Sequence, residues 1–304
     1  MTYSDDRVVE IPGALPGSAE WLQYMTGSKI AAVMGLSPYE SRFSLHLRMQ
    51  GRVEGKVVTD EMQRGHYLEP AIRAWFCDQH PGWGLHKTGM LASRTRDLHA
   101  VSPDGLITAD RGELRLFEAK SAMFADEWGE PGSGEIPIGY RCQVMWGMDL
   151  LGVKVAHVAV LTGQLTFVEY VVEYDADDAA LLRKSADDFL AELAAGERPD
   201  IDGHSETYEV IKAMHPEIAP MTVEVPEDLF RLYCQSKAAV QAAEFEARRA
   251  TSLVADHMGR AQRAVFAGRA LASRQAKKGG TPYVVAARSL PNPSAPTDLE
   301  VNAS

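Results

Sequence analysis

The sequence predicts an α/β (α+β) fold, and three observations support this prediction. Helical and strand-like patterns follow one another in the order helix, strands, helix, strands, helix up to about residue 200, which is typical of a sheet packed against helices. Short apolar runs bounded by Gly, Pro and Asp occupy the middle of the chain. The 304 residues, of which 45% are hydrophobic, suit one large globular domain with an extension.

The N-terminal part predicts an arm followed by three helices. Residues 1–19 are polar and contain two prolines, so we expect an arm with little structure of its own. A first helix is expected to begin at Gly27-Ser28, and a second to cover residues 43–49. A third is expected over residues 60–79, where apolar side chains recur every three to four positions.

The central part predicts strands on both sides of one apolar helix. We expect strands over residues 98–101, 106–108, 114–119, 155–162 and 165–174, the last two forming a hairpin, with a helix around 138–151 between the groups. A further helix is expected from residue 177 to 195, where Gly196 ends the Ala/Leu pattern. Together with the preceding helices, these elements predict a core that spans residues 20–200.

The C-terminal part predicts a basic, mainly helical extension over residues 201–290 and a disordered tail over 291–304. Residues 226–278 are Ala-rich with a helical pattern, and residues 283–288 suit one strand. The tail is rich in Pro, Asn and Ser, a composition that cannot build a packed core.

The formal charge of −11 argues at first against a nucleic-acid partner, because such partners are usually bound by basic surfaces. The charge is unevenly placed, however. Between Arg231 and Lys278 ten Lys and Arg face three Asp and Glu, a local charge of +7 that leaves −18 for the rest. On a continuous helix, Arg260 and Arg263, with Arg249, share one face. That face suits either DNA phosphates, or a solvated or subunit-contacting surface.

Cysteine usage and the absence of targeting signals predict a cytoplasmic protein with no membrane association. The three cysteines are far apart and odd in number, so they predict no disulfide framework. The N-terminus has no basic region followed by an apolar core, and no stretch approaches the ~18 apolar residues of a membrane span.

Two short motifs carry the candidate chemistry. Asp104 lies in a turn after a predicted strand, and Glu118 and Lys120 follow on the next strand, where residues two apart share a face. Neighbouring carboxylates suit a hard divalent cation. A nearby ammonium can orient or deprotonate water and stabilise charge on a phosphate. Taken alone, the same residues are also typical of an ordinary turn and an exposed strand pair.

Five ordered blocks make the pattern more specific: GSKIAAVMGLSPY (27–39), MQRGHYLEPAI (62–72), SPDGL (102–106), FEAK (117–120) and IPIGYRCQVMWGM (136–148). With these blocks, residues 20–175 resemble the YqaJ-like viral recombinase (lambda exonuclease) family of the PD-(D/E)xK nuclease superfamily. The resemblance implies a restriction-endonuclease-like mixed β-sheet core flanked by helices. It also implies Mg²⁺- or Mn²⁺-dependent 5′→3′ digestion of linear double-stranded DNA.

The resemblance also implies roles for individual residues. Asp104, Glu118 and a helix-borne Glu69 would bind the metal. Lys120 would assist the attacking water, and Gln143 would orient water or a metal-bound group. Ser28 would lie near the terminal 5′-phosphate. The arginine that the family places before the Ser28 block is absent here, where Met25 stands nearby. A preference for 5′-phosphorylated ends is therefore not predicted, and Arg42, Arg48 and Arg64 remain alternatives.

Other side chains near these blocks have structural interpretations. We expect His66 to be structural rather than a metal ligand, and Ser102 to hydrogen-bond its own turn backbone. Tyr140 is expected to pack rather than to stack near DNA, and Trp146 and Met148 are expected to belong to the core.

The family implies partners as well: a single-strand annealing protein of the RecT/Beta kind in phage or prophage recombination, and a homotrimer around DNA. Two alternatives stay open. One is another PD-(D/E)xK repair or structure-specific nuclease, although three cysteines cannot supply the four thiolates of an iron–sulfur cluster. The other is a catalytically silent DNA-end-binding module, against which the complete set of site residues argues.

Overall fold

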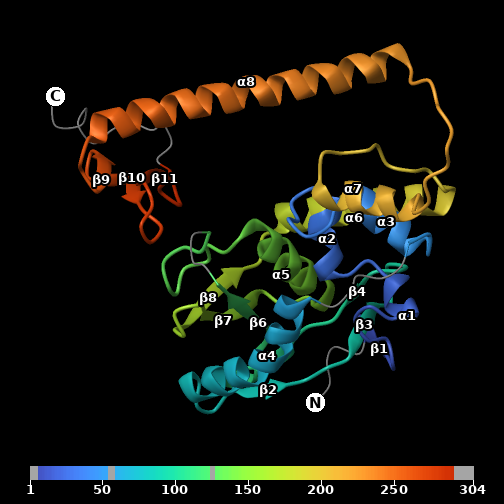
Figure 1. The fold of residues 1–304 in the computed structure, drawn as a ribbon. Helices are drawn as coiled ribbons and strands as arrows, with labels where there is room; N and C mark the ends of the chain where they lie inside the picture. The colour runs from blue at the N-terminus through green and yellow to red at the C-terminus, as the bar shows by residue number, and fades with distance from the viewer. Residues whose placement is uncertain (1–5, 54–58, 124–126, 291–304) are drawn as a thin grey trace, which may run out of the picture. The chain divides into compact units, whose positions relative to one another are not determined.

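The structure is a computed structural model that describes residues 6–53, 59–123 and 127–290. The chain divides into two compact units, Met1–Ile218 and Ala219–Ser304. The first unit contains the mixed sheet and its helices (Figure 1).

A five-stranded mixed sheet forms the centre of the first unit and confirms the predicted fold class. Its strand order is β2-β5-β6-β7-β8. Strands β6 and β7 pair in parallel, and the other neighbours pair antiparallel. The strands are β2 (Gly84–His86), β5 (Gly105–Thr108), β6 (Leu114–Ala122), β7 (Val155–Thr162) and β8 (Phe167–Glu173).

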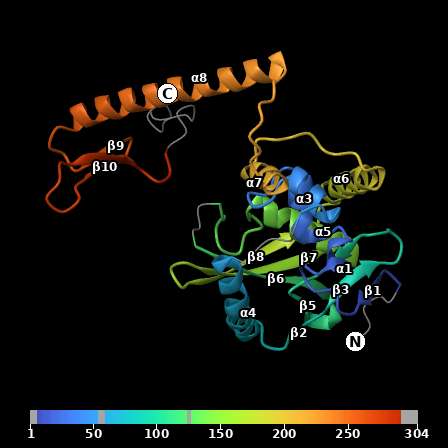
Figure 2. The same ribbon diagram turned by 45° about the vertical axis from the view of Figure 1, so that its right-hand side comes forward.

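Helices cover both faces of this sheet, and the alternation of side chains along β6 and β7 shows how. Leu116 and Val158 pack in one apolar cluster with residues of α2 (Gly27–Val33), α5 (Ile138–Leu151) and α6 (Ala176–Ala195). Their chain neighbours Phe117 and Ala159 pack in a second cluster with Ile72 and Phe76 of α4 (Asp60–Gln79). Adjacent residues of one strand therefore serve opposite layers, and Figure 2 shows α4 and α5 on opposite faces of the sheet.

The expected unstructured arm is wrong for the described residues 6–19. Strand β1 (Val8–Ile11) pairs antiparallel with β3 (Met90–Ser93), which pairs with β4 (Ala100–Val101) in a small second sheet. Val8 is buried in the core, so the apolar start of β1 outweighs the prolines that follow it. A short helix, α1 (Ala19–Leu22), comes next, with Ser18 as its N-cap.

The predicted helices of the first unit are confirmed with small shifts at their ends, including α3 (Arg42–Met49). Strands β2 and β3 were not predicted, and a 3₁₀ turn, η1 (Asp110–Gly112), precedes β6. Helix α7 (Ser205–Met214) packs Val210 against Phe43 and Leu47 of α3. The core therefore runs to Ile218 rather than to residue 200.

The second unit is helical only in its first part, so the prediction of a helix through residue 278 is wrong. Helix α8 (Glu227–Met258) ends before Gly259. A sheet in the order β11-β10-β9 follows, made of β9 (Arg263–Phe266), β10 (Arg269–Gln275) and β11 (Tyr283–Ala286). Ala267 and Gly268 both have positive φ (47° and 75°) and join β9 to β10, as a two-residue hairpin turn requires. The predicted disordered tail, 291–304, lies outside the described residues.

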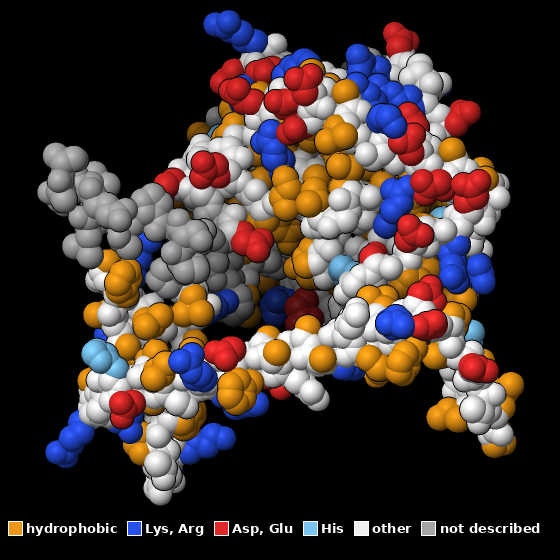
Figure 3. Space-filling view, turned by 90° about the horizontal axis from the view of Figure 1, so that it is seen from above, with side chains coloured by type: hydrophobic (Ala, Val, Ile, Leu, Met, Phe, Trp, Pro, Cys, Tyr) orange, Lys and Arg blue, Asp and Glu red, His pale blue; other side chains and the backbone are white. Residues whose placement is uncertain are grey.

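The surface of the second unit contains both hydrophobic and charged side chains. Hydrophobic side chains lie among charged groups of both signs along α8 (Figure 3). No helix in the described ranges is long and apolar enough to cross a membrane.

Candidate active site

The candidate site lies on the α5-facing side of β6, next to the start of β5. Glu118 is 1% exposed, and its Oε2 accepts hydrogen bonds from Lys120 Nζ (2.9 Å) and Gln143 Nε2 (3.0 Å). Lys120 shares the face of β6 with Glu118, and Gln143 comes from α5. The structure therefore brings three of the predicted residues into direct contact.

Asp104 joins this group through the backbone of the same strand. Its Oδ2 accepts a hydrogen bond from the Ala119 N–H at 2.8 Å, and Arg73 of α4 donates to its carbonyl oxygen. Both contacts fix the turn between β4 and β5. They hold the Asp104 carboxylate beside Glu118, where the two carboxyl groups interact.

Burial controls the electrostatics of the pair. It raises the pKa of Glu118 to about 8, with a further increase from Asp104 and a decrease from the ammonium of Lys120. For Lys120, burial alone lowers the pKa, but the charges of Glu118 and Asp104 outweigh it, and the pKa is raised. Beside these two carboxyl groups the ammonium form of Lys120 is favoured, and it can donate hydrogen bonds and stabilise negative charge.

These residues fit a hard divalent cation. Two adjacent carboxylates and a carboxamide offer oxygen donors, which Mg²⁺ and Mn²⁺ prefer. Burial raises the pKa of Glu118 although the Lys120 ammonium lies 2.9 Å away, and a bound cation would further favour the ionised carboxylate. Asp104 and Glu118 are the residues that would hold it.

Glu69 does not join them directly. It lies on α4, and its Oε1 is 3.6 Å from Lys87 Nζ. Among the described residues, Glu69, Asp104 and Glu118 do not form a group with ligand atoms all within 4.8 Å. Glu69 lies one helical turn before Arg73, and Arg73 contacts Asp104. A role for Glu69 as a metal ligand stays a prediction.

A small cavity connects Ser28 with the carboxylate. Its volume is about 20 Å³, room for about one water molecule. The lining residues are Thr26, Gly27, Ser28, Val101, Ser102, Glu118 and Gln143. The Ser28 hydroxyl lies 3.2 Å from that of Thr26. The structure thus places Ser28 in the wall of the same cavity as Glu118.

Ser102 belongs to this cavity, and its expected turn hydrogen bond is wrong. Among the residues that the structure describes, none forms a hydrogen bond with the buried Ser102 Oγ. The sequence could have indicated that Ser102 lines the site, because it lies two residues before Asp104 in the same loop, and loop residues next to a functional carboxylate often line the same site.

Two of the arginines considered for binding a terminal 5′-phosphate are already paired with carboxylates. Arg42 donates to Glu192 at 2.6 Å, and the buried Arg48 pairs with Glu40. Arg260 and Arg263 belong to the second unit, one after α8 and the other in β9, so their expected common helical face is wrong.

Of the other predictions, Trp146 and Met148 are core residues, Tyr140 packs against Trp128, and His66 is exposed on α4.

Comparison with solved structures finds similar exonucleases. The alkaline exonuclease LHK-Exo from Laribacter hongkongensis is 24% identical over 66% of this chain and 100% of that chain, with a TM-score of 0.47. A phage-related exonuclease from Haemophilus somnus 129PT is 11% identical over 57% of this chain and 96% of that chain, with a TM-score of 0.43. No curated protein matches the chain.

The family comparison covers the part of the chain that builds the site. Residues 20–154 match the YqaJ-like viral recombinase domain. This range contains Ser28, Asp104, Glu118, Lys120 and Gln143. These residues meet around one buried carboxylate and its cavity. The match to the YqaJ-like viral recombinase domain therefore covers the part of the chain that builds the candidate site.

Proposed function

We propose that this protein is a metal-dependent deoxyribonuclease, an exonuclease that hydrolyses phosphodiester bonds of linear double-stranded DNA in the 5′→3′ direction. The observation that carries the proposal is the buried Glu118, which lies beside Asp104 and is contacted by Lys120 and Gln143. A structural role alone does not explain why a carboxylate, an ammonium and an amide are buried together next to a cavity.

The reaction divides among these residues. Asp104 and Glu118 would hold Mg²⁺ or Mn²⁺, and such an ion would supply positive charge near the scissile phosphate and lower the pKa of water. Lys120 donates hydrogen bonds to the water or to the phosphate oxygens and stabilises charge as the bond breaks. Gln143 fixes the orientation of the Glu118 carboxylate through its 3.0 Å hydrogen bond. The hydroxyls of Ser28 and Ser102 line the adjacent cavity and can donate to a phosphate oxygen there.

A nuclease assay tests the proposal. Linear duplexes labelled at either end are incubated with the full chain and Mg²⁺, beside closed circular DNA. We expect loss of linear DNA from its 5′ ends, abolished by EDTA and reduced at least ~1,000-fold in Glu118→Gln. Glu173→Gln, an exposed carboxylate at the end of β8, is the control and keeps full activity.

Other outcomes separate the alternatives. Equal cutting of circular DNA would indicate a structure-specific or repair-type nuclease of the same superfamily. DNA-end binding without Mg²⁺-dependent cleavage would indicate a catalytically silent module. Either result contradicts the proposed exonuclease.

We also propose that the protein acts in phage-type recombination with a single-strand annealing protein of the RecT/Beta kind, and as a homotrimer. Light scattering of the full chain that gives a monomer mass would exclude the trimer. Failure of such an annealing protein to co-elute with the chain would exclude a stable complex.

A further inference from the structure

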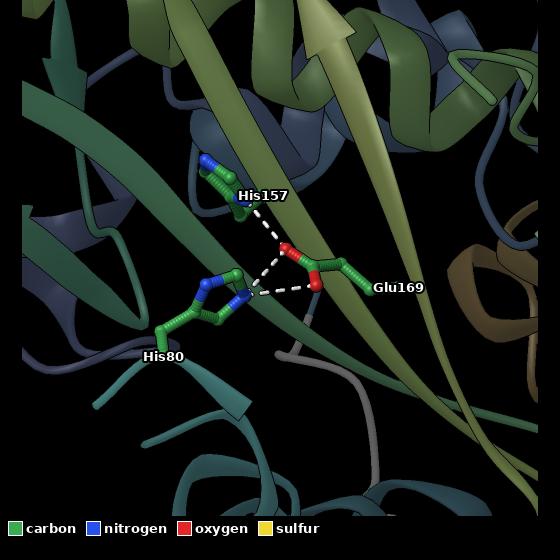
Figure 4. A group of neighbouring side chains, drawn as sticks. All are labelled: His80, His157 and Glu169. Atoms are coloured by element: carbon green, nitrogen blue, oxygen red, sulfur yellow. Dashed lines mark hydrogen bonds and ion pairs between the residues drawn. The ribbon is translucent and has the colours of Figure 1, made fainter. Parts of the chain in front are cut away.

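Three side chains from separate parts of the chain converge on the α4-facing side of the sheet, on the opposite face from the candidate active site. His80 follows α4, His157 lies on β7, and Glu169 lies on β8 (Figure 4). His157 lies opposite Phe117 in the parallel pairing of β6 with β7, and the Phe117 side chain packs in the cluster shared with α4. One ligand atom from each side chain lies within 4.8 Å of the other two.

The contacts among these side chains are short and direct. Glu169 Oε1 lies 2.5 Å from His157 Nδ1, and Glu169 Oε2 lies 2.9 Å from His80 Nε2. Burial alone would raise the pKa of Glu169, but hydrogen bonds from His157 and His80 outweigh it and lower the pKa. These hydrogen bonds therefore favour the ionised carboxylate, which points toward the two imidazole rings (Figure 4).

Aromatic side chains fix the rings in place. Trp83 stacks on His80 with ring centroids 4.3 Å apart, and Phe76 lies 4.5 Å from the same ring. The His157 side chain is 4% exposed, whereas those of His80 and Glu169 are about one-fifth exposed. The group is thus rigid on its inner side and accessible to small solutes on its outer side.

We propose that His80 Nε2, His157 Nδ1 and the Glu169 carboxylate form a second metal site that binds Zn²⁺. Two imidazole nitrogens with one carboxylate form a common zinc ligand set, whereas Mg²⁺ prefers oxygen ligands alone. With bonds of about 2.0–2.1 Å, tetrahedral ligands lie roughly 3.3 Å apart. The His157–Glu169 and His80–Glu169 contacts of 2.5 Å and 2.9 Å would therefore lengthen by about 0.8 Å and about 0.4 Å when an ion enters. The ion would tie the end of α4 to the β7–β8 hairpin.

Arg115 sets the condition for zinc binding. Its Nη1 lies 3.1 Å from His157 Nε2, and a guanidinium only donates hydrogen bonds. In the metal-free protein, Nε2 therefore accepts from Arg115, and Nδ1 carries the proton that it donates to Glu169. When zinc binds Nδ1, this proton moves to Nε2, and Arg115 must withdraw. Glu113, already 2.6 Å from Arg115 Nη2, remains as its partner. Arg115 thus weakens zinc binding.

The test uses the full chain with Asp104→Asn and Glu118→Gln, which removes the carboxylates of the candidate active site. Zn²⁺ is titrated against a chromophoric chelator, and a crystal grown with Zn²⁺ is examined by anomalous diffraction. We expect one ion between the three side chains and a zinc-dependent increase in Tm. Because both active-site carboxylates are absent, this result is independent of whether the protein is a nuclease.

Matched variants give the proposal its sharpest test. His80→Gln and His157→Gln can keep a hydrogen bond to Glu169 but should each weaken zinc binding at least ~100-fold. His215→Gln, an exposed control, should leave it unchanged. Arg115→Gln should tighten it about tenfold, since a carboxamide oxygen can accept from Nε2–H. Unchanged affinity in the two ligand variants, no tightening in Arg115→Gln, or an anomalous peak elsewhere would overturn the proposal.

Discussion

At the scale of single residues, Glu118 is the most informative side chain in the molecule. It is almost completely buried, yet it lies between an ammonium and a carboxamide rather than in an apolar pocket. Its position on β6 was predicted from the sequence because the period of a strand places Glu118 and Lys120 on one face. The degree of burial was not predictable, because it depends on α5 and α2, which are distant in the chain.

The raised pKa of Glu118 predicts a pH dependence of stability in the metal-free protein. At pH values between 4.5, the ordinary pKa of Glu118, and about 8, its pKa in the folded protein, Glu118 is ionised in the unfolded chain but keeps its proton in the folded chain. The free energy of unfolding should therefore fall as the pH rises through this window, by on the order of a few kcal/mol. Urea unfolding of the full chain in EDTA at several pH values measures this change.

The control for this experiment is Glu118→Gln, which mimics the protonated carboxyl and cannot ionise. In this variant the decrease in stability between about pH 4.5 and 8 should largely disappear. An equal decrease in both proteins would assign the effect to other groups. In the wild type, uptake of Mg²⁺ below pH 8 should release a proton, because the metal requires the ionised carboxylate.

At the scale of elements, the site depends on the close approach of α2 and α5. A Cβ added at Gly27 would lie 3.0 Å from the Gln143 carbonyl oxygen and 3.1 Å from its Cγ. Gly27→Ala should therefore push the helices apart and destabilise the protein by about 1–3 kcal/mol, and it should also reduce nuclease activity by displacing Gln143. Thermal unfolding and the end-labelled DNA assay measure the two effects.

Gly65 in α4 is the matched control, because a Cβ there meets nothing within 4 Å. Gly65→Ala should stabilise the protein by about 0.4–1 kcal/mol, since alanine loses less backbone entropy in a helix. If both substitutions shift Tm in the same direction, the prediction that Gly27 is required for the close approach of α2 to α5 is wrong.

The elements also show where sequence reasoning succeeds. Helix α5 was predicted over the range that the structure gives, because its apolar pattern is long and ends at Gly152, a residue with φ of 71°. Strands β9 and β10 were missed because their Ala-rich sequence has high helical propensity. The Ala267-Gly268 turn, rather than propensity, fixes their pairing. The His80–His157–Glu169 group was missed because its members are distant in sequence and share no motif.

At the scale of the whole molecule, the chain consists of two units joined by an exposed segment. Ile218, Met221 and Val223 are among the most exposed large apolar side chains, and between α7 and α8 no regular secondary structure protects the backbone. Local unfolding and protease access are easiest in such segments.

Limited proteolysis of the full chain should therefore cut first between residues 215 and 226. Mass spectrometry of the products should show a core fragment that ends in this range. The isolated fragment should retain the circular dichroism of a mixed sheet with helices, because its apolar clusters include no residue of α8. Early cleavage within β5–β8, or a core fragment that unfolds, would contradict the division into two units.

The alternation along β6 has a consequence for how this protein can change in evolution. Phe117 and Glu118 are adjacent in the chain but serve the α4 layer and the candidate active site, respectively. Insertion or deletion of a single residue within β6 would exchange these two environments, leaving an aromatic ring beside Asp104 and a carboxylate in the apolar layer. Length variation among descendants of this sequence should therefore be confined to loops such as residues 129–135 and to the segment between the units, while β6 keeps a constant length.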